Sequence, residues 1–188
     1  MMPLTPERVE QKLRERFPDA AIERQTGDAV RDYTLYVPGE SLVEMCTFLR
    51  DDAELDFGML PWMGGCDHMP AVPRFETVYN LLSLSNSLRF TLKVRIAEEQ
   101  PRVPSVVAVW PTANWHERET YDFYGIEFTG HPELTRILLP DDWVGWPLRK
   151  DSPLGYEEVA FTHNTPNRRL PSPSLKKLAP KKVKYRAQ

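Results

Sequence analysis

Residues 88–97 read LRFTLKVRIA, and apolar and polar side chains alternate along this stretch as far as Ile96. The apolar positions are Leu88, Phe90, Leu92, Val94 and Ile96. The polar positions between them are Arg89, Thr91, Lys93 and Arg95. Successive side chains of a strand point to opposite faces of a sheet. The alternation therefore predicts a half-buried antiparallel strand with a basic outer face.

Four further strands are predicted upstream of this one. They are Ala20–Gln25, Asp32–Val37, Glu54–Met63 and Phe75–Leu84. Gly27-Asp28 lies in the turn between the first two strands, and Ser85-Asn86-Ser87 makes a short hairpin loop before residue 88. Most connections are too short for a crossover between parallel strands, so the sheet is predicted to be largely antiparallel.

Two helices are predicted in the same region. Thr5 is a suitable N-cap, and Pro6 suits the first helical position that follows it. Ser41 is expected to cap the second helix, and Glu44 three residues later completes a capping box. The predicted fold class over residues 5–97 is therefore α+β, a two-layer domain with a largely antiparallel sheet and helices on one face.

Residues 98–164 form a second segment of different character. It contains one short helix, Trp115–Tyr124, which Asn114 and Glu117 are expected to begin as a capping box. Gly125 is expected to end the helix as its C′ residue. The rest of the segment has little periodicity, so the sequence predicts an extended C-terminal arm after the α+β domain.

The net charge of −3 hides an uneven distribution along the 188 residues. Residues 165–188 are a basic, proline-rich tail, and its last 21 residues hold eight Lys or Arg and no acid. The body before the tail holds the remaining 16 of the 24 basic residues and all 27 acidic residues, so its net charge is −11. The tail is interpreted as a strap across an anionic partner, and RNA or membrane headgroups would fit its charge equally well.

Several classes of protein are excluded by composition. No stretch approaches the ~18 apolar residues of a transmembrane helix, and the charged start of the chain lacks a secretory signal. The two cysteines, Cys46 and Cys66, do not make a disulfide framework, which favours a reducing cytoplasm. The whole chain lacks the basic excess of a nucleic-acid binder. We also find no P-loop, GxGxxG, GxSxG or CxxC motif.

The predicted helix Trp115–Tyr124 carries large or charged side chains all round. One side of the helix is expected to carry Glu117, Tyr121 and Tyr124. Another side is expected to carry Glu119, Asp122 and Ile126. One interpretation is a helix wedged between its own domain and a partner, with carboxylates directed at basic groups. The other is an ordinary surface helix with solvated acids.

Two catalytic interpretations of this region are weaker. His116, Glu117, Glu119, Asp122 and His131 lie close in sequence, but they lack the HExxH spacing of a zinc helix. Glu117 and Glu119 stand two positions apart and point to different sides of a helix, so they cannot flank one bond as acid and base. A free-standing acid/base enzyme using these histidines and glutamates remains the alternative to a binding role.

Cys46 lies on an apolar helical stripe and is interpreted as a core residue. Cys66 lies in the sequence Gly64-Gly65-Cys66-Asp67-His68 and is interpreted as a thiol in a glycine loop rather than a nucleophile. Residues 128–154 are strongly apolar without regular structure, so they must pack against something. Within them, residues 142–151 combine two Trp with Arg, which is typical of interface hot spots or of a loop packed on its own domain.

The sequence from Glu117 to Asp151 resembles the signature of the C subunit of bacterial NADH-quinone oxidoreductase, respiratory complex I. The resemblance is specific over about residues 102–161, and it includes Trp110-Pro111 before the helix. The signature residues, which the resemblance implies are partner-interface residues, are Glu117, Arg118, Glu119, Tyr121, Asp122, Tyr124, Gly125, Ile126, Phe128, His131, Pro132, Leu134, Arg136, Leu138, Asp142, Trp143, Gly145, Pro147, Leu148, Arg149, Lys150 and Asp151.

The resemblance implies a subunit with no catalytic, cofactor-binding or metal site of its own. The complex would use NADH, FMN, iron–sulfur clusters and a quinone, and it would translocate protons. It further implies a scaffold of the peripheral arm, on the cytoplasmic side of the bacterial inner membrane, packed against the quinone-site subunit and the terminal iron–sulfur subunit. Membrane association would then be indirect, and nucleic acid is not an expected partner. The alternative is an equivalent subunit in a ferredoxin- or hydrogenase-type complex.

Overall fold

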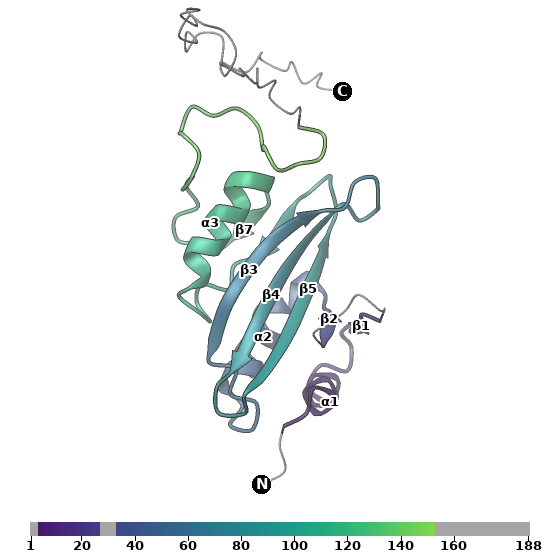
Figure 1. Ribbon diagram of the computed structural model, residues 1–188. Coiled ribbons are helices and arrows are strands. Elements are labelled where there is room, and N and C mark those ends of the chain that lie inside the picture. Colours follow the sequence, from purple (N-terminus) through teal and green to yellow (C-terminus); the bar gives the residue numbers. More distant parts are fainter. Residues whose placement is uncertain (1–3, 27–32, 153–188) are drawn as a thin grey trace, which may run out of the picture.

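The computed structural model describes residues 4–26 and 33–152 (Figure 1). Its elements in chain order are α1 (Pro6–Arg16), β1 (Glu23–Arg24), β2 (Thr34–Tyr36), the 3₁₀ turn η1 (Gly39–Ser41), α2 (Leu42–Asp51), β3 (Met59–Asp67), β4 (Phe75–Ser83), β5 (Leu88–Ile96), β6 (Arg102–Pro104), α3 (Ala113–Tyr124) and β7 (Glu127–Thr129). Among the described residues, no helix is long and apolar enough to cross a membrane.

The main sheet has five strands in the order β1-β2-β5-β4-β3. Strands β3, β4 and β5 pair antiparallel over most of their length, as do β1 and β2. Strands β2 and β5 pair parallel, which is possible because helix α2 and the β3–β4 hairpin separate them in sequence. The prediction of a largely antiparallel sheet is confirmed, with this one parallel pair.

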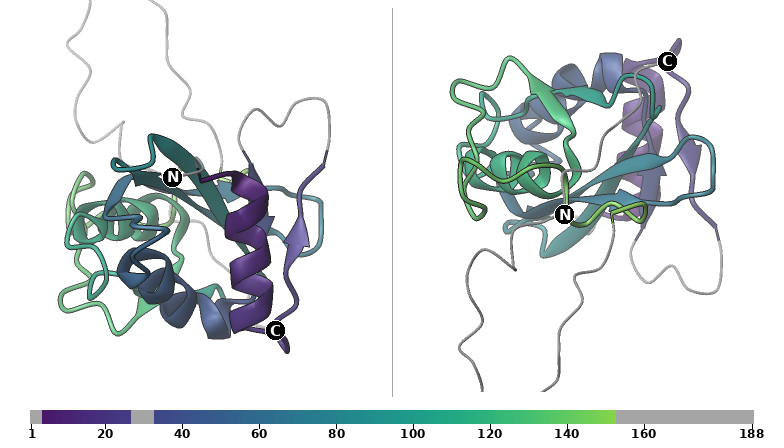
Figure 2. Two further views of the ribbon diagram at one scale, coloured as in Figure 1. Left: turned by 90° about the horizontal axis from the view of Figure 1, so that it is seen from below. Right: turned by 90° about the horizontal axis from the view of Figure 1, so that it is seen from above.

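The three helices lie on one face of the sheet (Figure 2). Phe90, Leu92, Val94 and Ile96 of β5 point to that face and are buried in the core with Val9 of α1 and Met45 of α2. Arg89 and Arg95 alternate with them and are exposed, as the sequence pattern predicted. The two-layer α+β fold is therefore confirmed.

Helix α3 packs on the same face, at the β3 edge. A Cβ built on Gly65 would lie 2.8 Å from Thr120 Cγ2 and 3.0 Å from Tyr124 Cδ2, so the missing side chain allows α3 to approach β3. Trp62 covers Gly64 on the opposite face, where a built Cβ would lie 2.7 Å from Trp62 Cζ2. The adjacent glycines are thus positions of close contact within a strand.

The strand prediction Glu54–Met63 was wrong in position, because β3 spans Met59–Asp67. Leu55 and Phe57 lie in the turn region before β3, and the side chains of both are buried. Two apolar residues separated by one position therefore resemble the alternation of a strand. The two N-terminal strands are shorter than predicted, Glu23–Arg24 and Thr34–Tyr36. The predicted turn at Gly27-Asp28 lies outside the described residues.

The helix caps were predicted with mixed success. Thr5 accepts a hydrogen bond from the Arg8 amide at 3.4 Å, which confirms the first cap. Ser41 makes no side-chain capping bond, because the η1 turn leads directly into α2. Helix α3 begins at Ala113 after Thr112, so the predicted capping box of Asn114 was wrong.

The hydrophobic core continues past residue 97 without a break. Val103, Trp110, Ile126 and Phe128 are buried in the same cluster as the strands of the main sheet. Trp110 Nε1 donates a hydrogen bond to the carbonyl oxygen of Phe57 at 3.0 Å. Strands β6 and β7, which the sequence did not predict, pair parallel beside α3. Helix α3 is consequently held by the same core as α1 and α2.

Candidate functional site

Helix α3 holds the long loop, residues 130–152, through two side chains one turn apart. Arg118 Nε and Nη2 donate hydrogen bonds to the carbonyl oxygens of Thr135 and Arg136, at 3.1 and 3.0 Å. Asp122 Oδ2 accepts hydrogen bonds from three successive amides, those of Ile137, Leu138 and Leu139, at 3.1, 2.8 and 2.9 Å. The helix therefore binds both the acceptors and the donors of the loop backbone.

Asp122 is fully buried and forms an ion pair with Arg136, whose Nη1 lies 2.7 Å from Asp122 Oδ1. Arg136 Nη2 also donates to the carbonyl oxygen of Trp143 at 3.2 Å. Burial alone would raise the pKa of Asp122, but the three amides and the guanidinium outweigh it and lower the pKa. The basic group at which the Asp122 carboxylate is directed is therefore Arg136 of the same chain.

Glu117 occupies a different environment on the inner side of the same helix. It is fully buried, and its carboxylate accepts hydrogen bonds from Ser105 Oγ at 2.6 Å and from the Val106 amide at 2.7 Å. Burial raises its pKa to about 7, against the effect of these two hydrogen bonds. Glu117 is neither a solvated surface acid nor paired with an arginine, so both interpretations of its carboxylate were wrong.

Trp146 covers the C-terminal end of α3. Its ring meets Tyr121 edge-on at 5.1 Å between centroids, and the Arg136 guanidinium lies 4.8 Å from the centroid of the Trp146 ring. Gly125 ends the helix with φ +69°, as predicted, and its amide donates to the Tyr121 carbonyl oxygen. A Cβ on Gly125 would lie 2.5 Å from Trp146 Cε2, so glycine is required by both its φ and the ring above it.

A second anchor fastens the far end of the loop to the main sheet. Arg74, nearly fully buried, contacts Asp67 through Nε and Nη2, at 3.0 and 2.8 Å. Nη2 also lies 2.7 Å from Asp151 Oδ1, and Asp67 Oδ2 accepts the Lys150 amide at 2.8 Å. Although burial opposes ionisation, these donors hold the pKa of Asp67 well below its usual range. Sequence reasoning missed Asp67 and Arg74 as an anchor, since the loop residues that they bind, Lys150 and Asp151, lie far along the chain.

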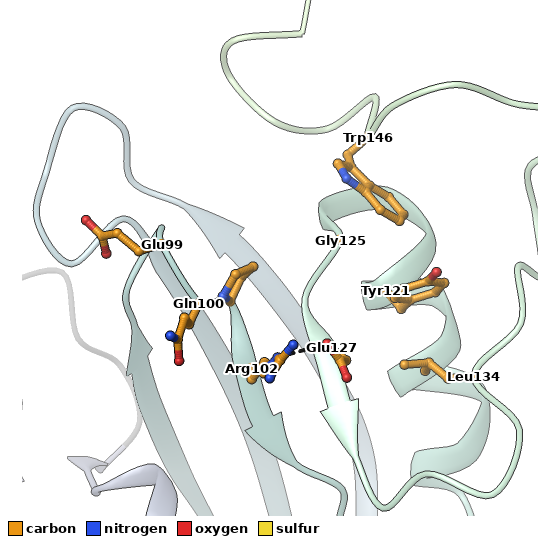
Figure 3. Close-up of a pocket in the computed structure, with 9 residues that line it drawn as sticks. Glu99, Gln100, Arg102, Tyr121, Gly125, Glu127, Leu134 and Trp146 are labelled. Carbon is orange, nitrogen blue, oxygen red and sulfur yellow. Dashed lines mark hydrogen bonds and ion pairs between the residues drawn. The ribbon is translucent and has the colours of Figure 1, made fainter. Parts of the chain in front are cut away.

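A hollow of about 490 Å³ lies between residues 99–102 and the C-terminal half of α3 (Figure 3). Tyr121, Leu134 and Trp146 line one side of it. Arg102 Nε forms a solvent-exposed ion pair with Glu127 at 3.0 Å on the other side. The hollow has an aromatic wall and a charged rim, and it opens beside the ring that covers Gly125.

The loop presents apolar side chains to solvent. We call the exposed residues Leu138, Trp143, Val144 and Leu148 the apolar patch, and their exposed fractions run from 38% to 61%. Trp115 of α3 is also exposed, with the Arg118 guanidinium 5.5 Å from its ring centroid. Asp122 and Arg136 bond within the chain, whereas these apolar groups lack cover from the described residues.

The signature residues fall into three groups by burial. Those buried within this chain are Glu117, Asp122, Ile126 and Phe128. Those partly buried are Arg118, Tyr121, Tyr124, Gly125, His131, Leu134, Arg136, Gly145, Pro147 and Arg149. Those exposed are Glu119, Pro132, Leu138, Asp142, Trp143, Leu148, Lys150 and Asp151. The structure thus brings them together around α3, and it buries two of the charged ones, Glu117 and Asp122.

The residues considered for acid/base or metal chemistry do not converge. His131 Nδ1 accepts the Glu133 amide at 3.0 Å, and Glu117 and Asp122 are bound to the separate partners described above. Cys46 is fully buried in the core, as predicted. Cys66 was placed wrongly, because it lies within strand β3 rather than in a glycine loop.

A firmly anchored loop with exposed apolar side chains is typical of the class of proteins that bind other proteins. A family model described as respiratory-chain NADH dehydrogenase, 30 Kd subunit, matches residues 35–158. The chain therefore belongs to this family of respiratory complex I subunits.

Relatives and solved structures agree with this assignment. The C subunit of the NADH-quinone oxidoreductase of Roseiflexus sp. is 51% identical over 82% of this chain and 87% of its own. The C subunit of the Herpetosiphon aurantiacus enzyme is 47% identical over 83% of this chain and 89% of its own. The solved trypsin-resistant fragment of Nqo5 is 34% identical, with a TM-score of 0.54, and the match covers 68% of this chain and 98% of the fragment. A chain of an archaeal membrane-bound sulfane sulfur reductase shares the fold, at 24% identity, over 79% of this chain and 85% of its own, with a TM-score of 0.62.

Proposed function

We propose that this chain is a non-redox scaffold subunit in the peripheral arm of a proton-translocating NADH-quinone oxidoreductase. It holds the quinone-reducing module in position and supports electron transfer from NADH to quinone without binding a cofactor itself. The FMN, the iron–sulfur clusters and the quinone belong to other subunits of the complex. The arm lies on the cytoplasmic side of the bacterial membrane, which this chain reaches only through its partners.

One observation carries the proposal, namely that buried ion pairs and hydrogen bonds fix the loop while four of its apolar side chains face solvent. Asp122, Arg136, Arg74 and Asp151 bond to each other or to the loop backbone, which fixes the loop on α3 and β4. The apolar patch is left in solvent by the same bonds. Exposed apolar groups on a fixed backbone favour binding because little conformational entropy is lost on association.

The proposed partners are the quinone-site subunit and the terminal iron–sulfur subunit. The apolar patch would contact them directly, which makes the interface apolar at its centre with Asp142 and Lys150 at its rim. NADH is proposed as the electron donor because the named relatives are NADH-quinone oxidoreductase subunits.

The test places a charge in the apolar patch of the chain within its native complex. Leu138→Glu and Val144→Glu should each leave the unfolding midpoint of the purified chain unchanged, since both side chains are mostly exposed. Each should reduce the amount of assembled complex that co-purifies with the chain, because a charge buried at an apolar interface is costly. Val72→Glu is the matched control, since Val72 is exposed in the β3–β4 loop outside the patch.

Normal assembly with both patch variants would contradict the proposed docking surface. The scaffold role itself is tested separately, with the purified chain alone. It should be colourless and should not turn over NADH or quinones, whereas turnover by the isolated chain would favour an enzyme. Mass spectrometry of the co-purified neighbours would identify the two subunits that contact the chain.

A further inference from the structure

The face of the main sheet opposite the helices carries a cluster of three metal-ligating side chains. Cys66 of β3 stands directly opposite Glu76 of β4 in the antiparallel register. His68 follows Cys66 by two residues, so the alternation of a strand places its side chain on the same face. The donor atoms of these three residues all lie within 4.8 Å of one another. The cluster lies on the face opposite α3 and takes no part in the contacts described above.

We propose that Cys66, His68 and Glu76 bind a divalent transition-metal ion of the zinc type. A thiolate, an imidazole and a carboxylate are the ligand types that zinc accepts, at about 2.0 to 2.3 Å. Donor atoms around a tetrahedral ion of that size lie about 3.3 to 3.8 Å apart. His68 Nε2 and Glu76 Oε1 are already 3.7 Å apart, so binding requires the side chains to close by only about 1 Å.

The burial of the three residues suits an accessible site. Glu76 is buried, Cys66 is half-buried and His68 is exposed. The exposed imidazole leaves an ion a path from solvent to the buried carboxylate. Three protein ligands leave a fourth position for water or an added molecule.

Lys93 of β5 is the group that opposes metal binding. Its Nζ lies 2.8 Å from Glu76 Oε1 and neutralises the carboxylate in the absence of an ion. Tyr36 and Arg95 stand beside it, with the Arg95 guanidinium 3.8 Å from the Tyr36 ring centroid. A metal ion must displace the ammonium or bind the other carboxylate oxygen. The competing interpretation is a plain Lys93–Glu76 ion pair beside an unligated thiol.

The experiment measures zinc binding by calorimetry on the full chain, without an affinity tag and with a reductant that contains no thiol. Cys66→Ala and His68→Ala should each weaken zinc binding by more than about tenfold, because each removes a ligand. Glu76→Gln should weaken it as well. His116→Ala is the matched control and should bind zinc as the unaltered chain does. Thermal unfolding checks that each variant is folded, and His68 is exposed enough that its variant will fold.

Two further measurements distinguish the site from the plain ion pair. Cobalt should produce a thiolate charge-transfer band that Cys66→Ala abolishes, although Cys46 is still present. Lys93→Met should bind zinc more tightly than the unaltered chain, because a competing cation is removed. Unchanged zinc affinity in Cys66→Ala or His68→Ala would overturn the proposal, and unchanged affinity in Glu76→Gln would exclude Glu76 as a ligand.

Discussion

Asp122 of helix α3 and Arg136 of the long loop form an ion pair, with 2.7 Å between Oδ1 and Nη1. The carboxylate has no exposed surface, and its second oxygen binds three consecutive amides of the loop. A buried charge with this many donors stabilises one conformation of the loop strongly, because any rearrangement leaves the charge without partners. The pair therefore determines where the apolar patch stands.

Asp122→Asn should destabilise the chain by about 3–5 kcal/mol, because Arg136 and part of the amide cluster lose their acceptor. In the complex, this variant and Arg118→Ala should reduce assembly more than they alter turnover per assembled complex. Urea unfolding of the chain and native gels of the complex measure the two effects. Glu44→Gln, exposed on α2 outside the signature, should change neither. A fully assembled complex with low turnover would contradict this assignment.

Glu117→Gln should change the pH dependence of stability. The folded pKa of about 7 lies above the ordinary value of 4.5, so the native chain holds a proton that the unfolded chain has released between these values. The stability of the unaltered chain should therefore fall by about 3 kcal/mol as pH rises from about 4.5 to 7. The neutral amide of the variant should remove this fall. Urea unfolding of both proteins at pH 5 and pH 8 tests this prediction. An equal change in unfolding free energy between the two pH values would contradict it.

Much of the fold could be predicted from local sequence, and the site could be predicted only in part. Alternation defined β5, and Gly125 defined the end of α3, because both signals are contained in a few neighbouring residues. The end of β3 was misplaced because Gly64-Gly65 resembles a loop, whereas each glycine in fact receives a neighbouring side chain. A sequence pattern does not show which element packs against a strand.

The partners of the acids could not be predicted for a similar reason. Glu117 three residues after Asn114 matches a capping box, but a buried bond to Ser105 replaces the local one. The contact of Arg74 with Asp151 spans 77 residues and leaves no periodic signal. The resemblance did indicate the residues around α3, and the fold was needed to show that their charges act within the chain.

Arg74→Met should destabilise the chain by about 3–5 kcal/mol, because Asp67 is left buried and charged. Arg102→Met is the matched control. Its pair with Glu127 is exposed on both sides, so its loss should cost less than about 1 kcal/mol. Arg74→Met should also release the end of the loop, which limited proteolysis near Asp151 would detect. Equal losses of stability for the two variants would show that the buried Arg74 pair contributes no more to stability than the exposed Arg102 pair.

Gly125→Ala should destabilise the chain far more than Gly130→Ala, although both glycines have positive φ, at +69° and +85°. At either position alanine costs roughly 1 kcal/mol in backbone strain. A Cβ on Gly130 would meet no described atom within 4 Å, whereas one on Gly125 would overlap Trp146 and Arg149. Gly125→Ala should therefore also displace the Trp146 ring from Tyr121. Tryptophan fluorescence and urea unfolding of both variants measure the difference, and equal unfolding free energies would show that Trp146 does not rest on Gly125 in solution.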